Sequence, residues 1–174
     1  IHMSLGDHLR NVIKDGAKIK IATSRFSMYA YEALSADLNK IESIEILFTD
    51  PAPQLDNEHN KRTNRIFHIP KSEDHTELYG SNYEIRLKNR LTQKAIARDF
   101  AHWMELKATV KRNTSNQPMQ QFIIVESHNQ TSIYMPIQGF TAPDLGFNQG
   151  APISNLVNFS NDEIYAQTFK TLFN

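Results

Sequence analysis

Apolar residues occur at regular spacing in the first fifty residues of the chain. They recur at helical spacing in residues 5–15, and Gly16 follows where a helix would end. Lysine and isoleucine alternate within residues 17–23, and this period of two predicts a strand. Residues 26–41 have the pattern of an amphipathic helix, and residues 44–48 predict a second strand. A strand, a helix and a strand in this order favour a parallel strand pair with a right-handed crossover.

The middle of the chain has a polar region followed by one long helical pattern. Residues 50–64 are polar and interrupted by prolines, which predicts a loop, and a short strand is predicted at 66–69. Ser81 and Glu84 have the spacing of a capping box, so the sequence predicts a helix over residues 82–106.

The last third of the chain predicts three strands and a closing helix. The strands are at 109–111, 122–125 and 133–135, and the helix is at 163–173. Together the elements predict an α/β domain with a central mixed sheet and helices on both faces. We expect residues 3–174 to form a single domain, and we interpret Ile1 and His2 as a cloning remnant.

Composition limits the kinds of site and partner. The chain has 19 lysines and arginines and 19 aspartates and glutamates, so DNA contact would need a local basic patch. The absence of cysteine excludes disulfides, thiol nucleophiles and thiolate zinc sites. No stretch approaches the roughly 20 apolar residues of a membrane span, and the first residues lack the apolar core of a signal peptide. The sequence therefore predicts a cytoplasmic protein without a membrane partner.

Two segments in the last third of the chain have a distinctive layout of strand, turn, strand and turn. The first is Met119–Glu126, with the sequence MQQFIIVE, and the second is Ile133–Gly146, with the sequence IYMPIQGFTAPDLG. Together they resemble the core of a half-domain of the phospholipase-D (HKD) superfamily. In that family the first strand carries His-x-Lys-x-x-x-x-Asp, and the second ends in a Gly-Ser-x-Asn turn that commonly continues N-F-T-x-x-G-L. This chain has an F-T-x-x-x-L element at Phe140–Leu145. The resemblance implies the α/β fold of a phospholipase-D-like half-domain.

The positions that carry the family's chemistry hold other residues in this chain. Gln120 stands at the position of the family's histidine, Phe122 at the lysine and Ser127 at the aspartate, and the Gly-Ser-x-Asn turn falls on Pro136–Gly139. In the family, the histidine attacks phosphorus, while the lysine and the asparagine neutralise the developing charge. Gln120, Phe122 and Gly139 cannot supply these groups. The resemblance therefore implies a degenerate, catalytically silent domain without catalytic residues, metal or cofactor.

Further positions are similar to the N-terminal segment of bacterial helicases. They include Tyr83–Ala97 and Trp103, and the similarity spans roughly residues 10–174. In those proteins a phospholipase-D-like domain precedes a superfamily-two motor of the Swi/Snf or DEAD type. The resemblance implies a DNA-processing role in restriction, defence or repair, with an ATP-dependent motor domain as a partner in the same parent chain. This chain has no Gly-x-x-x-x-Gly-Lys-Ser/Thr motif, so it should not hydrolyse ATP itself. Active family members build one site from two half-domains, so the resemblance also implies a homodimer.

The predicted long helix carries a row of cations. Arg86, Arg90, Lys94 and Arg98 recur every four residues and lie about 6 Å apart in one slowly drifting stripe. The neighbouring stripe is apolar, with Leu87, Leu91, Ala95, Phe100 and Trp103. The cationic stripe has the spacing to follow a DNA backbone. The alternative is a solvated face whose cations pair with nearby carboxylates, and such a face would favour a protein-interaction domain without DNA contact.

The other hypothesis is a working phosphodiesterase or nuclease with catalytic groups at non-standard positions. The residues that could provide such catalytic groups are His102, Arg98 and the histidines of the predicted loop. Ser24 and Arg25 follow the first predicted strand, where α/β sheets bind ligands. The discriminating feature is whether a histidine lies beside a lysine or asparagine at the carboxyl edge of the sheet.

Overall fold

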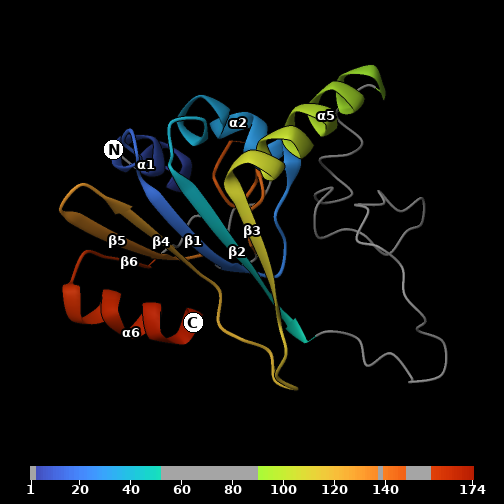
Figure 1. Ribbon diagram of the computed structural model, residues 1–174. Helices are drawn as coiled ribbons and strands as arrows, with labels where there is room; N and C mark the ends of the chain where they lie inside the picture. The colour runs from blue at the N-terminus through green and yellow to red at the C-terminus, as the bar shows by residue number, and fades with distance from the viewer. Residues whose placement is uncertain (1–2, 52–89, 137–138, 148–157) are drawn as a thin grey trace, which may run out of the picture.

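The computed structural model describes residues 3–51, 90–136, 139–147 and 158–174 (Figure 1). The elements are α1 (Leu5–Val12), β1 (Lys18–Thr23), α2 (Met28–Leu38), β2 (Ser43–Pro51), α5 (Arg90–Lys107), β3 (Ala108–Asn113), β4 (Phe122–Ser127), β5 (Gln130–Met135), β6 (Asn158–Ser160) and α6 (Glu163–Phe173).

The described strands form one mixed sheet of six strands in the order β3-β2-β1-β4-β5-β6. β1 pairs in parallel with β2, and β2 pairs in parallel with β3. β4, β5 and β6 each run antiparallel to the strand before them in the sheet order. The predicted strand-helix-strand unit is confirmed, with Ile19 level with Ile44 across the parallel pair.

Helices cover both faces of the sheet, as the sequence predicts. Figure 1 shows α1, α2 and α5 on one side of the sheet and α6 on the other. The alternation in β1 explains both layers, because Ile19 and Ile21 enter the core under α1, α2 and α5, while Ala22 enters the core under α6. The prediction of an α/β fold with a central mixed sheet is therefore confirmed.

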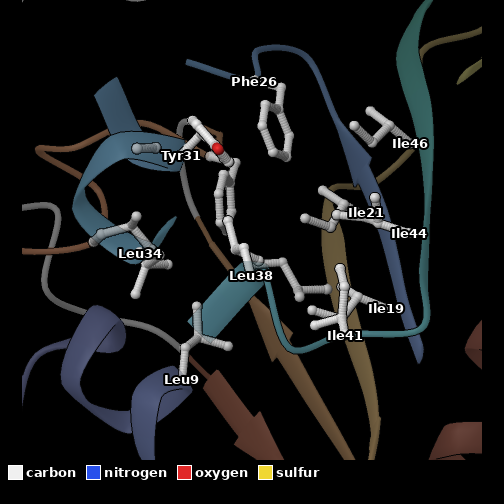
Figure 2. Close-up of a cluster of buried hydrophobic side chains, with 14 of the residues drawn as sticks. Leu9, Ile19, Ile21, Phe26, Tyr31, Leu34, Leu38, Ile41, Ile44 and Ile46 are labelled. Carbon is white, nitrogen blue, oxygen red and sulfur yellow. The ribbon is translucent and has the colours of Figure 1, made fainter. Parts of the chain in front are cut away.

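The larger core lies between the sheet and the three helices α1, α2 and α5. Figure 2 shows side chains of β1, α2 and β2 gathered with Leu9 of α1. Phe26, just before α2, stacks on Phe100 and Trp103 of α5, with ring centroids 5.8 and 6.3 Å apart. The indole nitrogen of Trp103 donates to the carbonyl of Leu38 at 3.1 Å, so the one polar atom of this buried ring is satisfied.

The smaller core lies under α6. Phe169 and Phe173 of α6 pack on Phe122 of β4, with ring centroids 4.9 and 6.2 Å apart. Ile124 and Ile133 complete this layer from β4 and β5. Asp162 caps the helix by accepting hydrogen bonds from the first backbone N–H groups, which fixes where α6 begins.

Beside α6 the sheet carries an ion cluster instead of apolar side chains. The carboxylate of Glu45 contacts the ammonium groups of Lys20 at 2.6 Å and Lys111 at 2.7 Å. Both ammonium groups also lie near the ring of Phe173, at 4.9 and 5.3 Å from its centroid. Hydrogen bonds from Lys111 and Lys20 lower the pKa of Glu45 below its usual value of 4.5.

This cluster predicts a dependence of stability on acid pH. The pKa of Glu45 is lower in the folded than in the unfolded chain, so its contribution is full above pH 4.5 and is lost as the pH falls through the folded-state pKa. We expect Glu45→Gln to be less stable than the wild type at pH 7, and the difference to shrink as the pH falls below 4.5 toward the folded-state pKa, as measured by urea unfolding. Glu42→Gln is the control, because Glu42 and Lys18 form a pair whose side chains are both more than half exposed. Equal pH dependence in the two variants would contradict the prediction.

Several elements differ from the predicted bounds. α1 ends at Val12 and α2 at Leu38, each three residues before the predicted end, and β5 begins at Gln130, three residues before its predicted start. β2 extends to Pro51, so the first two residues of the loop predicted at 50–64 belong to a strand. β6 was not predicted, because its three residues are too few to show a period of two. Only its pairing with β5 identifies it as a strand. Ala95 is exposed, and Ile96 takes its place in the core. The predicted helix continues to Lys107, one residue beyond the expected end.

Several predictions fall outside the described residues. They are the rest of the loop at 52–64, the strand at 66–69, the capping box at Ser81 and Glu84, and the helix over residues 82–89. Within the parts of the chain that the structure describes, no helix has the length and apolar character needed to cross a bilayer.

Candidate functional site

The carboxyl edge of the parallel strands is the natural place to look for a site in an α/β sheet. Here the chain after β1 meets the segment after β5. The carbonyl of Arg25 accepts a hydrogen bond from the N–H of Phe140 at 2.9 Å, and the carbonyl of Phe140 accepts one from the N–H of Ser27 at 2.9 Å. The buried hydroxyl of Thr23 also donates to the carbonyl of Arg25, at 2.7 Å. These bonds join two segments more than 100 residues apart into one turn framework.

Gly139 belongs to this framework, and its backbone conformation favours glycine. Its φ is +142°, in the region that favours glycine. A Cβ atom there would lie 3.2 Å from both the carbonyl oxygen of Arg25 and the hydroxyl of Thr23. The glycine at this position is therefore required by the backbone, whatever chemistry the turn supports.

Gln121 holds the turn after β1 from the other side. Its amide oxygen accepts a hydrogen bond from the backbone N–H of Ser24 at 3.0 Å and lies 3.1 Å from the hydroxyl oxygen of Thr23. The hydroxyl of Ser24 lies within 3.3 Å of the same oxygen. Sequence reasoning missed Gln121. Only its position next to Gln120 at the start of a strand could have drawn attention to it.

The four positions of the family motif lie in three different environments. Gln120 is exposed at the carboxyl edge, and its amide nitrogen lies 3.4 Å from the sulfur of Met135. Phe122 is buried in the core under α6. Ser127 lies at the opposite end of β4, where its hydroxyl accepts the N–H of Lys14 at 3.3 Å. Gln120 and Gly139 therefore share one edge of the sheet, while Phe122 and Ser127 have no access to it.

His8 is the best-connected histidine of the described residues. Its Nδ1 lies 2.8 Å from the hydroxyl of Tyr134, and its ring packs on Phe159 with centroids 4.7 Å apart. Burial raises the pKa of Tyr134 to about 12, so the hydroxyl stays protonated at neutral pH and can donate to Nδ1. His8 therefore joins α1 to β5 and β6 through its ring.

The other described histidines do not reach the carboxyl edge either. His102 is exposed on α5, and His128 lies in the turn between β4 and β5, at the opposite edge of the sheet. Among the described residues, no histidine has a hydrogen bond or ring contact with Gln120 or Gly139. No group of three or more histidine, aspartate or glutamate side chains in these residues could hold a metal ion.

The F-T-x-x-x-L element forms a turn that docks α1. The hydroxyl of Thr141 donates to the carboxylate of Asp144 at 2.5 Å and accepts the N–H of Asp144 at 3.3 Å. Leu145 is buried, and its carbonyl accepts the N–H of Gly6 in α1 at 2.9 Å. The element has a structural role in this chain.

Two of the four predicted DNA-binding cations can be located in full. The side chains of Lys94 and Arg98 are both exposed on α5. The guanidinium of Arg98 lies 3.7 Å from the exposed carboxylate of Asp99, and an exposed pair of this kind contributes little to stability. The backbone of Arg90 begins α5, while Arg86 and the side chain of Arg90 lie outside the described residues.

The exposed cations of α5 lie on a helix whose inner face packs on the segment after β1. Phe100 stacks on Phe26, which directly follows the turn after β1, and Arg98 is two residues before Phe100. Arg25 of that turn is also exposed. Exposed carboxylates balance part of this positive charge, because Asp99 lies beside Arg98 and Asp50 is exposed at the end of β2.

Comparison with models of known protein families gave no match, and comparison with curated proteins gave none either. Among solved structures, the chain is similar to a mutant of yeast tyrosyl-DNA phosphodiesterase 1, with 14% sequence identity and a TM-score of 0.35. The match covers 76% of this chain and 24% of the other, so this chain spans about a quarter of that protein's length. At this TM-score the likeness does not assign the chain to a family.

Proposed function

We propose that this chain is a catalytically silent phospholipase-D-like domain that docks DNA for the motor of a bacterial superfamily-two helicase. The observation that carries the proposal is a hydrogen-bonded turn framework at the carboxyl edge, with the neutral amide of Gln120 at the position of that family's nucleophile. An amide side chain cannot attack phosphorus, and the position of the family's lysine is filled by the buried ring of Phe122. The framework can therefore stabilise the fold, but it provides no group for phosphoryl transfer.

The exposed cations of α5 support the DNA-docking part of the proposal. Lys94 has no ion-pair partner among the described residues, and the exposed pair of Arg98 with Asp99 leaves the guanidinium accessible. Cations four residues apart on one helix face can contact successive phosphates of a strand. Arg86 and Arg90 extend the stripe by one turn each in the sequence.

Labelled duplex and single-stranded DNA should bind this chain with micromolar affinity at low salt, as measured by fluorescence anisotropy. With four phosphate contacts, the log–log dependence of affinity on salt should have a slope of about −3 to −4. The labelled strands should stay intact on a denaturing gel, because the proposed domain has no nuclease activity.

The double variant Lys94→Gln/Arg98→Gln should bind more weakly, and its salt slope should fall in magnitude by about 2. Addition of Arg86→Gln and Arg90→Gln should abolish micromolar binding. Lys14→Gln/Lys18→Gln is the control with the same loss of charge, at the amino edge of the sheet, and should keep the wild-type affinity. Absence of binding by the wild type at low salt would contradict DNA docking and favour a protein-interaction domain. Cleavage of the DNA would contradict the proposal that the domain lacks catalytic activity, and would favour the phosphodiesterase hypothesis.

A further inference from the structure

His102 lies in line with the two exposed cations of α5. Lys94, Arg98 and His102 are four residues apart, so each lies about one turn from the next along the helix, and all three are exposed. A helical residue turns by about 100°, so every fourth position advances by about 40° around the axis. The three side chains therefore occupy one strip of the helix surface that is about 80° wide.

The buried side of α5 fixes the direction in which this strip points. The buried residues of the helix are Ile96, Phe100, Trp103 and Met104. Phe100 and Trp103 pack on Tyr31 of α2, with ring centroids 5.4 and 4.9 Å apart. By the same rotation per residue, Arg98 lies almost directly opposite the middle of the buried set. The strip is therefore the outer face of α5.

The imidazole of His102 has no partner within the described parts of the chain. No hydrogen bond, ion pair or ring contact joins it to any of these residues. The charged groups nearest to it along α5 are Arg98 one turn before it, Asp99 three residues before it and Glu105 three residues after it, and all are exposed. α2 packs on the opposite face of the helix through Tyr31. The ring is therefore free to contact a ligand.

The proton on His102 decides the net charge of this face. Lys94 and Arg98 contribute two positive charges, while Asp99 and Glu105 contribute two negative charges. With a neutral imidazole, the charges of the outer face from Lys94 to Glu105 therefore sum to zero, and a protonated imidazole leaves one positive charge. Histidine is the side chain whose charge ordinarily changes between pH 5 and 8. The attraction of this face for an anion therefore increases as the pH falls.

We propose that His102 is a further phosphate contact of the DNA-docking face and makes DNA binding stronger at acid pH. The protonated ring donates from both nitrogens, so it can contact the phosphate next to the one that Arg98 holds. The neutral ring adds no charge and releases no counterion from the DNA. The inference rests on the proposed DNA docking and adds its regulation by pH.

Fluorescence anisotropy with labelled duplex DNA at about pH 5.5 and pH 8.0 measures this regulation. At about 50 mM salt the wild type should bind on the order of tenfold more tightly at the lower pH, because one more phosphate is neutralised. The log–log salt slope should also increase in magnitude by about 1. Equal affinity and equal slope at the two pH values would overturn the inference and leave DNA docking intact. Absence of binding at both pH values would overturn both.

Two variants of His102 separate its charge from other effects of pH. His102→Gln should bind at both pH values as the wild type does at pH 8.0. His102→Lys carries a permanent charge and should bind at both pH values as the wild type does at pH 5.5. A pH dependence that His102→Gln retains would overturn the inference. Because the position is exposed, circular dichroism should show a native fold for both variants.

His128→Asn is the matched control. His128 is also exposed, but it lies in the turn between β4 and β5 with a φ of +53°, a conformation that asparagine tolerates. This variant should keep the pH dependence of the wild type. Loss of the pH dependence in His128→Asn would overturn the assignment to His102.

Proton uptake provides a measurement that does not depend on affinity. If protonation of His102 favours DNA, then DNA must favour protonation of His102 to the same degree. Calorimetric titrations at about pH 6.5, in two buffers with different ionisation enthalpies, should show that the wild type takes up a fraction of a proton on binding. His102→Gln should take up less. Equal uptake by the two proteins would overturn the inference.

Discussion

Phe26→Ala is expected to lower the free energy of unfolding by about 3–5 kcal/mol. Phe26 is fully buried, and its ring stacks on Phe140, Phe100 and Trp103. Those partners come from the segment after β5 and from α5, so one ring joins the β1 turn to both. Alanine would leave a cavity that aromatic neighbours cannot fill without moving the turn framework.

Urea unfolding followed by circular dichroism measures this loss. Phe159→Ala is the matched control, because Phe159 is 46% exposed on the edge strand β6, where its ring contacts His8 and Tyr134. We expect the control to lose about 1 kcal/mol. Equal losses in the two variants would show that Phe26 does not organise this part of the core.

Phe122→Lys is expected to destabilise the chain by about 5 kcal/mol at pH 7. This substitution places the phospholipase-D family's lysine at its matching position. Phe122 is 1% exposed and packed between Phe169 and Phe173, so an ammonium group there would lose its water without gaining a carboxylate. The result should be a weaker fold and no gain of phosphodiesterase activity.

The pH dependence identifies the cause of this loss. Burial should hold the pKa of the introduced lysine below the ordinary value of about 10.4, so its penalty is full below the folded-state pKa and declines as the pH rises toward 10.4. Urea unfolding between about pH 7 and 10 should show Phe122→Lys approaching the stability of Phe122→Leu. Phe122→Leu should lose only about 1–2 kcal/mol at any of these pH values. A constant gap between the two variants would show that packing, not desolvation, dominates.

The local elements could be predicted because their signals are local. Alternation of Ile19 and Ile21 with lysines is a period of two, and it specifies a strand with two different faces. The closing helix was predicted with the bounds that α6 has, and in the structure Asp162 caps it. The order of strand, helix and strand was sufficient to predict the parallel pair of β1 and β2.

The rotation of α5 could not be predicted from its pattern alone. The sequence places Ala95 in the apolar stripe, but Ile96 is buried instead. Packing of Phe100 and Trp103 against Phe26 and Tyr31 sets which face of the helix turns inward. A helix with apolar residues on more than one side accepts several rotations, and only its neighbours select one.

Part of the candidate site could likewise be predicted from the sequence, and part depended on the tertiary structure. The sequence by itself determined that Gln120, Phe122 and Gly139 lack the groups that phosphoryl chemistry requires, because the identity of a side chain needs no fold. Only the tertiary structure decided that Gln121 holds Thr23, a residue 98 positions away, and that Phe122 lies under α6. Contacts between such distant residues depend on strand order and helix packing, and neither follows from the spacing of residues along a single element.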